Sequence, residues 1–321
     1  MAMKILILSC GTRYKLIEYF KDKKNGFDKV VATDCSEYAP ALYIADSFYI
    51  VPRMNEPTYL DKLYQICQNE HIDVILPLQE EELLLIAKER AKFEQMGILV
   101  AISGYEQLKL CKDKYALSSY LNDKKIPAIK TFLAEDVLKE EKWTTEVFVK
   151  PRYGAGSVGA IKVGSRQFLE ALVKENDSEQ LVVQPYIEGK EYGVDVYADY
   201  ISSETVAIFC KEKLRMRAGE TEKSRSVKIP QIEKLVSEAV LKLGLKGALD
   251  MDVFEYQGKY YILEINPRFG GGYPHAYECG INFPKMLAAN AKKEKNCSGE
   301  WDYEENVIAL KFSDIITMPE M

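Results

Sequence analysis

The chain has 321 residues, of which 47% are hydrophobic, and it carries a net charge of −6. This length suits roughly two or three compact units with packed cores. An acidic chain without a strong basic patch is not expected to bind nucleic acid, and no apolar run is long enough to predict a membrane span. The seven cysteines are scattered singly, which favours a reduced, cytoplasmic protein.

The first hundred residues alternate between the patterns of strands and helices. Short apolar runs predict strands at residues 4–9, 29–33, 74–77 and 98–102. Amphipathic segments between them predict helices at residues 13–21, 60–69 and 80–95. This order of elements predicts a small, doubly wound parallel sheet, and therefore an α/β domain at the N-terminus.

After residue 112 the pattern changes to strands that follow one another. Helices are expected at residues 114–122, 165–174 and 232–243, and strands at residues 147–150, 181–184, 193–200 and 205–217. Residues 248–265 read as a hairpin around Gln257–Gly258. We place domain boundaries near residues 110 and 185, which gives three segments, 1–110, 111–185 and 186–321.

The segment YYILEINPRFGGG near the C-terminus carries the strongest chemical signal. Strand alternation places Glu264 and Asn266 on one face, with Leu263 and Ile265 on the other. Arg268 follows at the end of the strand. Carboxylate and amide oxygens suit Mg²⁺, and a guanidinium suits phosphate. The segment therefore predicts a phosphoryl-transfer site.

The hairpin around Gln257–Gly258 can bring a second carboxylate to this face. A two-residue turn would pair Asp252 with Leu263 and send the carboxylate to the wrong face. A three-residue loop would instead set Asp252 opposite Glu264. Two opposed carboxylates repel each other unless a cation lies between them, so metal binding predicts the three-residue loop. Ordinary surface acids would fit either register.

The segment KPRYGAGSVGAIKV contains glycines at the spacing GxGxxG, at Gly154, Gly156 and Gly159. A second strand follows, so these glycines are expected at the tip of a hairpin, whereas a dinucleotide-binding loop opens into a helix. Such a loop can hold phosphates with its backbone N–H groups and the hydroxyl of Ser157. The alternative is a flexible surface hairpin, but Lys150 before the loop favours phosphate.

Four cations alternate along residues 205–217, at Lys211, Lys213, Arg215 and Arg217. In a strand they share one face. For the two lysines we favour a solvated edge face, because edge strands often carry lysines. The two arginines lie beside a glycine, and they either share that solvated face or reach an anionic substrate or phosphate.

Together these segments resemble the ATP-grasp superfamily, in particular the branch similar to the carbamoyl-phosphate synthase large subunit. The resemblance spans nearly the whole chain. It implies an N-terminal doubly wound α/β domain followed by an α+β ATP-grasp fold, whose two subdomains clasp ATP. Residues 111–185 would form the subdomain with the glycine loop, and residues 186–321 the subdomain with the metal ligands.

The resemblance also implies a nucleotide site. Asp113–Lys114 matches the DK pair of the family, and Lys114 and Lys150 would hold the α- and β-phosphates. The glycine loop, with Gly156 and Ser157, would close over the phosphates. Further nucleotide contacts are expected from the hinge residues Gln184, Pro185, Tyr186 and Ile187 and from the ribose ligand Glu191. The family more usually has glutamate where this chain has Gln184.

For the metal, the resemblance matches Asp252, Glu264 and Asn266 to ligands of two Mg²⁺ ions, with Mn²⁺ as an alternative ion. The carbamoyl-phosphate branch often has glutamine at the first of these positions. Arg268 matches the arginine that steadies the transferred phosphoryl group, and Arg217 is a second candidate for that role.

The implied activity is that of an ATP-dependent carboxylate–amine ligase that works through an acyl phosphate, with an amino acid as one substrate. Its partners would be small molecules, without nucleic acid or membrane, and a homodimer is compatible with the family. The acceptor pocket would involve residues 11–13 together with Arg215, Gly271, Gly272 and His275, although a lone histidine is more often structural. The alternatives are carbamoyl-phosphate-synthase-like or kinase-like phosphoryl transfer, or an inactive ATP-binding regulator.

Overall fold

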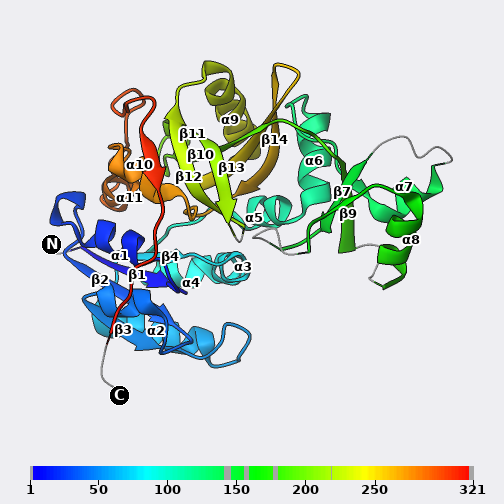
Figure 1. Cartoon of the computed structure of the whole chain (residues 1–321). Helices are drawn as coiled ribbons and strands as arrows, with labels where there is room; N and C mark the ends of the chain where they lie inside the picture. Colours follow the sequence, from blue (N-terminus) through cyan, green and yellow to red (C-terminus); the bar gives the residue numbers. More distant parts are fainter. Residues whose placement is uncertain (1–2, 141–145, 155–158, 176–179, 218, 318–321) are drawn as a thin grey trace.

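A computed structural model describes residues 3–140, 146–154, 159–175, 180–217 and 219–317 of the chain. Three sheets organise these residues (Figure 1): a parallel sheet near the N-terminus, a large antiparallel sheet, and a small antiparallel sheet that projects to one side. The predicted fold class, an α/β domain followed by an α+β fold, is confirmed. In the described residues no helix is both long and apolar enough to cross a membrane.

The N-terminal sheet has five parallel strands in the order β3-β2-β1-β4-β5. The strands are β1 (Lys4–Leu8), β2 (Lys29–Asp34), β3 (Ser47–Ile50), β4 (Val74–Pro77) and β5 (Leu99–Val100). The helices are α1 (Tyr14–Lys21), α2 (Tyr59–Glu70), α3 (Glu80–Lys88), α4 (Arg90–Gln95) and α5 (Tyr105–Lys112), with short 3₁₀ turns at Lys23–Asn25 and Pro40–Ile44.

The single helix predicted for residues 80–95 is wrong, because the helix is interrupted at Glu89. Arg90, the first residue of α4, donates hydrogen bonds to the carbonyl oxygens of Ile102 and Ser103, both at 2.8 Å. The start of α4 is thereby fixed to the chain that leaves β5. A tertiary contact of this kind has no signature in a helical periodicity.

The large sheet has six antiparallel strands in the order β14-β13-β10-β11-β12-β15. They are β10 (Lys190–Ala198), β11 (Thr205–Arg217), β12 (Glu220–Val227), β13 (Gly247–Tyr256), β14 (Lys259–Asn266) and β15 (Ile308–Leu310). Helices α6 (Lys114–Asp123) and α9 (Pro230–Leu243) pack on one face through a shared apolar cluster. Thus α6, although it lies in the expected segment 111–185, packs on the large sheet.

The hairpin between β13 and β14 sets Asp252 opposite Glu264, as metal binding predicted, but the predicted three-residue loop is wrong. Gln257 and Gly258 form a two-residue turn, with φ of 51° and 70°, as such hairpin turns require. The register is corrected by a bulge opposite Asp252, where Leu263 is the extra residue. Leu263 therefore lines the same cavity as Glu264, contrary to the simple alternation.

The small sheet has the order β6-β9-β7-β8, with antiparallel pairs. Its strands are β6 (Phe132–Leu133), β7 (Val147–Pro151), β8 (Ile161–Val163) and β9 (Leu181–Pro185), and helices α7 (Ala134–Lys139) and α8 (Arg166–Glu175) cover it. The predicted hairpin around the glycines is confirmed, because β7 and β8 pair antiparallel. Gly156 and Ser157 lie outside the described residues.

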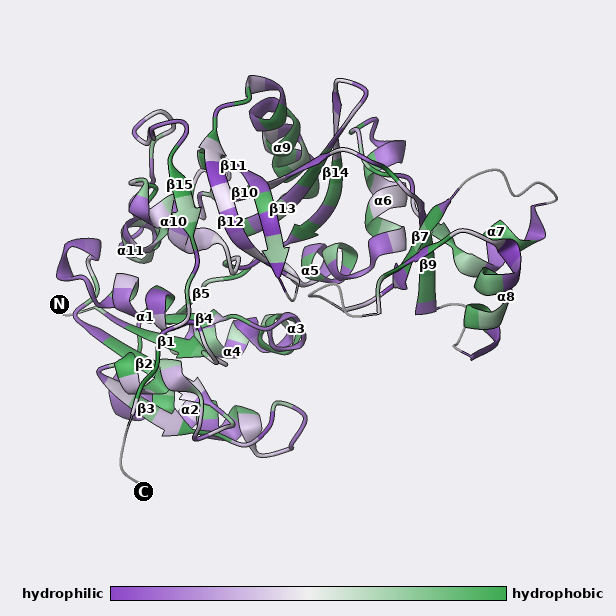
Figure 2. Ribbon diagram, viewed as in Figure 1, coloured by the Kyte–Doolittle hydropathy of each residue, from purple (hydrophilic) through white to green (hydrophobic). Residues whose placement is uncertain are grey.

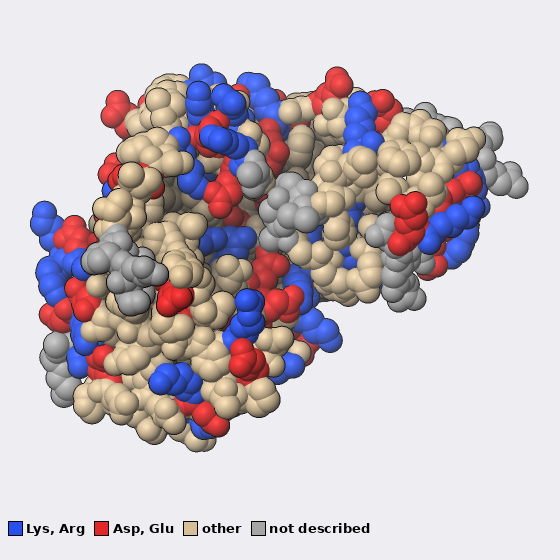
Figure 3. Space-filling model, turned by 60° about the horizontal axis from the view of Figure 1, so that its bottom comes forward, with Lys and Arg blue, Asp and Glu red and all other residues tan. Residues whose placement is uncertain are grey.

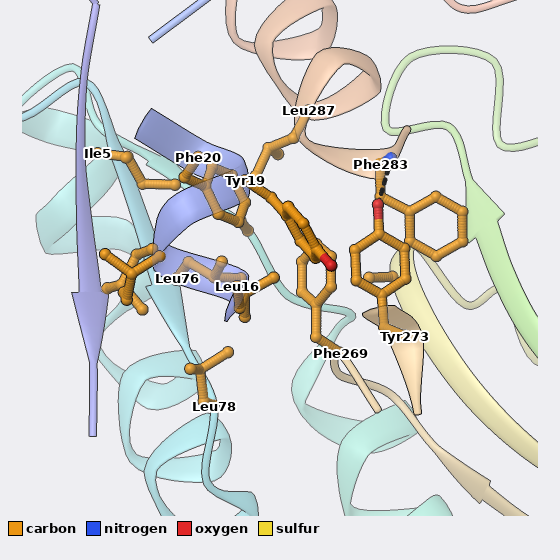
Figure 4. Packing of buried hydrophobic residues seen from close by; sticks show 14 of the residues in the cluster. Ile5, Leu16, Tyr19, Phe20, Leu76, Leu78, Phe269, Tyr273, Phe283 and Leu287 are labelled. Atoms are coloured by element: carbon orange, nitrogen blue, oxygen red, sulfur yellow. Dashed lines mark hydrogen bonds between the residues drawn. The ribbon is translucent and has the colours of Figure 1, made fainter. Parts of the chain in front are cut away.

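The N-terminal sheet is joined to the C-terminal part of the chain by one apolar core. The N-terminal strands are largely apolar (Figure 2). One face of their sheet packs through α1 against α10 (Tyr273–Glu278) and α11 (Phe283–Ala291). Figure 4 shows Leu16 and Phe20 of α1 facing Phe269 and Tyr273. This packing closes a cavity between the sheets, where the candidate site lies.

Candidate active site

A cavity of about 780 Å³ lies where the three sheets meet. Its walls come from the N-terminal loops around Arg13 and residues 78–81, from β7 and β9 of the small sheet, and from β10, β11, β13 and β14 of the large sheet. Basic and acidic side chains lie close together near the middle of the face shown in Figure 3. A cavity with mixed charges suits a polar, charged ligand better than an apolar one.

The carboxylates expected to bind metal lie on β13 and β14. Asp252 faces Glu264, and one step along the same face Asp250 faces Asn266. Burial raises the pKa of Asp252, and the neighbouring charges of Asp250 and Glu191 raise it further. The negative charge gathered here is therefore only partly neutralised by the protein.

The two lysines expected to bind phosphate come from other elements, Lys114 from the start of α6 and Lys150 from the end of β7. Lys150 is buried at the end of β7, with its Nζ atom 3.9 Å from Oε2 of Glu264. Burial lowers the pKa of Lys150, and the charge of Lys114 lowers it further, while Glu264 raises it. Lys114 donates a hydrogen bond of 2.5 Å to the carbonyl oxygen of Gly154, at the base of the glycine loop.

The interpretation of Lys211 and Lys213 as a solvated edge face is wrong. Strand β11 lies between β10 and β12, and both lysine side chains are less than a tenth exposed. Lys213 binds Glu191 at 2.5 Å and Asp252 at 2.6 Å. Lys211 forms a buried ion pair with Asp195. Both lysines line the cavity.

The predicted hinge residues Gln184, Pro185, Tyr186 and Ile187 all line the cavity, and so does Glu191. Lys162 lies 3.8 Å from the centre of the Tyr186 ring. The side chain of Gln184 is buried and donates a hydrogen bond of 2.8 Å to Oγ1 of Thr131. This bond ties the end of β9 to Thr131, so the side-chain amide of Gln184 is engaged within the protein.

The three arginines differ in their surroundings. Arg268 lines the cavity and lies 3.5 Å from Asp250 and 3.8 Å from Glu80. Arg217 also lines the cavity, but it is largely exposed and its nearest acid is Glu222, at 3.4 Å. Arg215 pairs with the same glutamate at 2.9 Å and is not among the residues that line the cavity.

Only some of the residues expected in the acceptor pocket line the cavity. Gly271 and Gly272 line the cavity. His275 does not line the cavity and lies in α10. Its ring is buried against Phe209, and its Nδ1 atom is 2.8 Å from Oγ of Ser224. Burial lowers the pKa of His275 to about 4, and the charge of Lys211 contributes.

Sequence reasoning gave no individual role to Lys213 or to Glu80, both of which line the cavity. The alternation of cations along β11 contained a signal for Lys213, which shares a face with Lys211 in the register with β12. Glu80 follows β4, at the carboxyl edge of a parallel sheet, where ligands of α/β domains commonly bind. Neither pattern alone could place its residue in the cavity, because that placement depends on the tertiary structure.

Two family models match the chain: an ATP-grasp domain over residues 111–272, and a PylC-like N-terminal domain over residues 5–101. Among curated proteins, the arginine-specific carbamoyl phosphate synthase large chain of Geobacillus stearothermophilus is 23% identical over 263 residues, and that of Bacillus subtilis 24% over 260 residues. These matches cover 78% and 76% of this chain and 24% of each relative. The chain thus spans about a quarter of their length.

Solved structures share the fold. The biotin carboxylase domain of Hydrogenobacter thermophilus 2-oxoglutarate carboxylase has a TM-score of 0.75 at 19% identity, over 96% of this chain and 73% of that one. The L-amino acid ligase of Bacillus licheniformis has a TM-score of 0.69 at 21% identity, over 90% and 74%. The ATP-grasp family model covers half of the chain, including strands β13 and β14 with Asp252 and Glu264. The chain belongs to the ATP-grasp family.

Proposed function

We propose that this protein is an ATP-dependent carboxylate–amine ligase that forms an amide or peptide-like bond through an acyl phosphate. The observation that carries the proposal is the meeting of opposite charges in one cavity. The face of Asp252, Glu264 and Asn266 lies beside Lys150 and ends at Arg268. That combination suits the metal and phosphate groups of ATP at the point of phosphoryl transfer.

In this proposal the adenine lies at the hinge of residues 184–187, and Glu191 binds the ribose hydroxyls. Lys114 and Lys150 hold the phosphates. The arrangement is supported by the common cavity that these described residues line.

The donor set fits Mg²⁺, because Asp252, Glu264 and Asn266 supply hard oxygen ligands on one face. Among the described residues, no three His, Cys, Asp or Glu side chains already form a metal site. The remaining ligands would then be phosphate oxygens, as is usual for Mg²⁺ at nucleotide sites. We propose two ions, which would neutralise charge on the β- and γ-phosphates.

The reaction has two steps. A carboxylate oxygen of one substrate attacks the γ-phosphorus of ATP, the bond to the bridging oxygen breaks, and ADP leaves. The amine nitrogen of the second substrate then attacks the acyl carbon, inorganic phosphate leaves, and the amine loses a proton. Arg268 stabilises the charge on the transferred group in both steps. The protein contributes positioning and charge neutralisation and supplies no nucleophile.

An amino acid is proposed as one of the two substrates. The likeness to an L-amino acid ligase supports this choice through the shared fold. The curated relatives are carbamoyl phosphate synthase large chains, but this chain spans about a quarter of their length. The unpaired cysteines suit a reducing compartment, and we propose the cytoplasm as the location.

The test is a screen of ADP release over pairs of carboxylates and amines, with Mg²⁺ and ATP. The proposal predicts release that requires both members of a pair. Glu264→Gln should abolish it, since a neutral amide is a much weaker ligand for Mg²⁺. Glu238→Gln is the matched control, because Glu238 is exposed on α9 and does not line the cavity.

Other results would point to the other functions. Release of ADP with a carboxylate alone, at the same rate as with both, would indicate a kinase-like enzyme. Binding of ATP without ADP release for any pair would indicate an inactive regulator. Full activity of Glu264→Gln would remove the metal assignment.

A further inference from the structure

Two guanidinium groups that line the cavity meet at one carbonyl oxygen. Arg13, in the loop after β1, donates from Nη1 to the carbonyl oxygen of Phe269 at 3.0 Å. Arg268 donates from its own Nη1 to the same oxygen at 3.1 Å. Both arginines line the cavity. The N-terminal domain thus places a second positive charge directly beside the arginine of the phosphoryl-transfer site.

Arg13 differs from Arg268 in having no acidic partner. Within the described residues, no carboxylate oxygen lies within 4 Å of its guanidinium, whereas Arg268 has both Asp250 and Glu80. Burial lowers the pKa of Arg13 to about 10, and the charge of Arg268 contributes. A partly desolvated cation beside a like charge is unfavourable unless an anion joins it. A guanidinium also offers five N–H donors, and most of those of Arg13 are unused by the described residues.

Acidic groups lie next to this pair without touching Arg13. Asp250 and Glu220 both line the cavity, and their charges raise the pKa of Arg13. The carboxyl group of Asp250 lies against the backbone at Gly270. A Cβ atom built on Gly270 would lie 2.5 Å from the carboxyl carbon of Asp250. This end of the cavity therefore offers positive and negative charges side by side. A zwitterion can pair with both, whereas a simple amine or a simple carboxylate can pair with only one.

We propose that this end of the cavity binds the amine-donating substrate as an α-amino acid, with its carboxylate on Arg13 and its ammonium group beside Asp250. This rests on the proposed ligase function, in which Arg268 holds the acyl phosphate. In an α-amino acid the nitrogen and the carboxylate are attached to the same carbon. The nonreacting carboxylate must therefore lie close to the acyl phosphate. The adjacency of Arg13 and Arg268 meets this requirement.

The test measures binding directly, by calorimetry, in the presence of Mg²⁺ and a nonhydrolysable ATP analogue. Each of the proteinogenic L-amino acids is titrated into the full-length protein, and the tightest binder is compared with its own carboxamide. The wild type should bind the amino acid about ten- to a hundredfold more tightly than the amide, as expected for a charge-assisted contact. Arg13→Met should bring this ratio close to one, and Arg13→Lys should retain part of it.

The control variant is Lys15→Met. Lys15 is a half-exposed cation two residues away, on α1, and its partner is Glu18. It should keep the wild-type ratio. Binding of the ATP analogue to Arg13→Met, measured in a separate titration without amino acid, reports whether that variant is folded. If it is not, the ratio in Arg13→Lys and Arg13→Gln decides the question.

Two results would overturn the proposal: no amino acid binds the wild type, or Arg13→Met keeps the preference for the carboxylate. These results are separate from a failure of the ligase function. Amino acid binding through Arg13 without ADP release for any substrate pair would support this binding site and contradict the ligase function. ADP release that proceeds equally well with the carboxamide in place of the amino acid would support the ligase function and contradict this binding site.

Discussion

Lys213 on β11 reaches across β10 to Asp252 on β13, with its Nζ atom 2.6 Å from the carboxylate. It also binds Glu191 on the strand between them, at 2.5 Å. Burial alone would lower the pKa of Lys213, but Asp252 and Glu191 raise it above its ordinary value. In return Lys213 lowers the pKa of Asp252, against the effect of burial. This lysine therefore favours the ionised form of a proposed metal ligand, whose pKa burial and the neighbouring acids raise.

Lys213→Met should move the acid limb of the kcat/KM profile to higher pH. Without the positive charge of Lys213, the pKa of Asp252 rises further, because burial and the neighbouring acids remain. A protonated carboxyl does not bind Mg²⁺ well, so activity should be lost at a higher pH than in the wild type. The measurement is the pH dependence of ADP release at saturating Mg²⁺.

The control for this prediction is Lys213→Arg, which keeps the charge and should keep the acid limb near its wild-type position. An unchanged limb in Lys213→Met would mean that Asp252 does not limit activity at low pH. A shift of equal size in both variants would point to altered packing, and the electrostatic explanation would then be wrong.

Lys211→Met should destabilise the protein by about 3–5 kcal/mol, because it leaves Asp195 as an unpaired buried charge. The two side chains are 2% and 1% exposed, so solvent cannot replace the lost partner. The double variant with Asp195→Val removes both charges and should recover most of the loss. Urea unfolding of the three proteins checks this. A single variant as stable as the wild type would show that the pair contributes little to folding.

The fold could be predicted in its main lines because it depends on local patterns. Apolar runs separated by amphipathic helices predicted the N-terminal parallel sheet, and Gln257–Gly258 marked the turn of the hairpin between β13 and β14. The bulge at Leu263 could not be predicted, since it has no compositional signal. It is nevertheless what brings Asp252 opposite Glu264 after a two-residue turn.

The environment of β11 could not be predicted, because it depends on strands from distant parts of the chain. Alternation correctly gave Lys211 and Lys213 a common face. Whether that face meets solvent depends on β12 and on the segment around Gly272, whose carbonyl oxygen accepts a hydrogen bond of 3.0 Å from Lys211. A period-two pattern gives the side of a strand, and long-range packing decides what covers it.

Gly270→Ala should reduce both activity and stability, because no space exists for the new methyl group. A Cβ atom there would lie 2.5 to 2.8 Å from the three carboxyl atoms of Asp250. Asp250 would have to move, and its contact with Arg268 with it. Overpacking of this kind costs about 1–3 kcal/mol, and displacement of the arginine should lower kcat by at least about tenfold.

The matched control for Gly270→Ala is Gly164→Ala, since no atom lies within 4 Å of a Cβ atom built on Gly164. Urea unfolding and initial rates of ADP release are measured for both. If the two variants behave alike, the close approach of Asp250 to the backbone at Gly270 is not a constraint on the site.

His275→Asn should reduce the loss of stability on acidification between about pH 6.5 and pH 4. Burial lowers the pKa of His275 to about 4 in the folded protein, from 6.5 in the unfolded chain. Within this window the unfolded state binds a proton that the folded state does not, so unfolding becomes easier as the pH falls. Asparagine does not titrate there, and its amide can replace Nδ1 in the contact with Ser224.

The measurement is the free energy of urea unfolding at a series of pH values, compared between each variant and the wild type. Taking the difference removes the contribution of other titrating groups, including Asp252, whose raised pKa has the opposite effect in this window. The control is His71→Asn, at an exposed helix end whose φ of 55° asparagine tolerates. That variant should follow the wild-type curve. A His275→Asn curve parallel to the wild type would show that the pKa of His275 is the same in the folded and the unfolded protein, and the lowered pKa would have to be rejected.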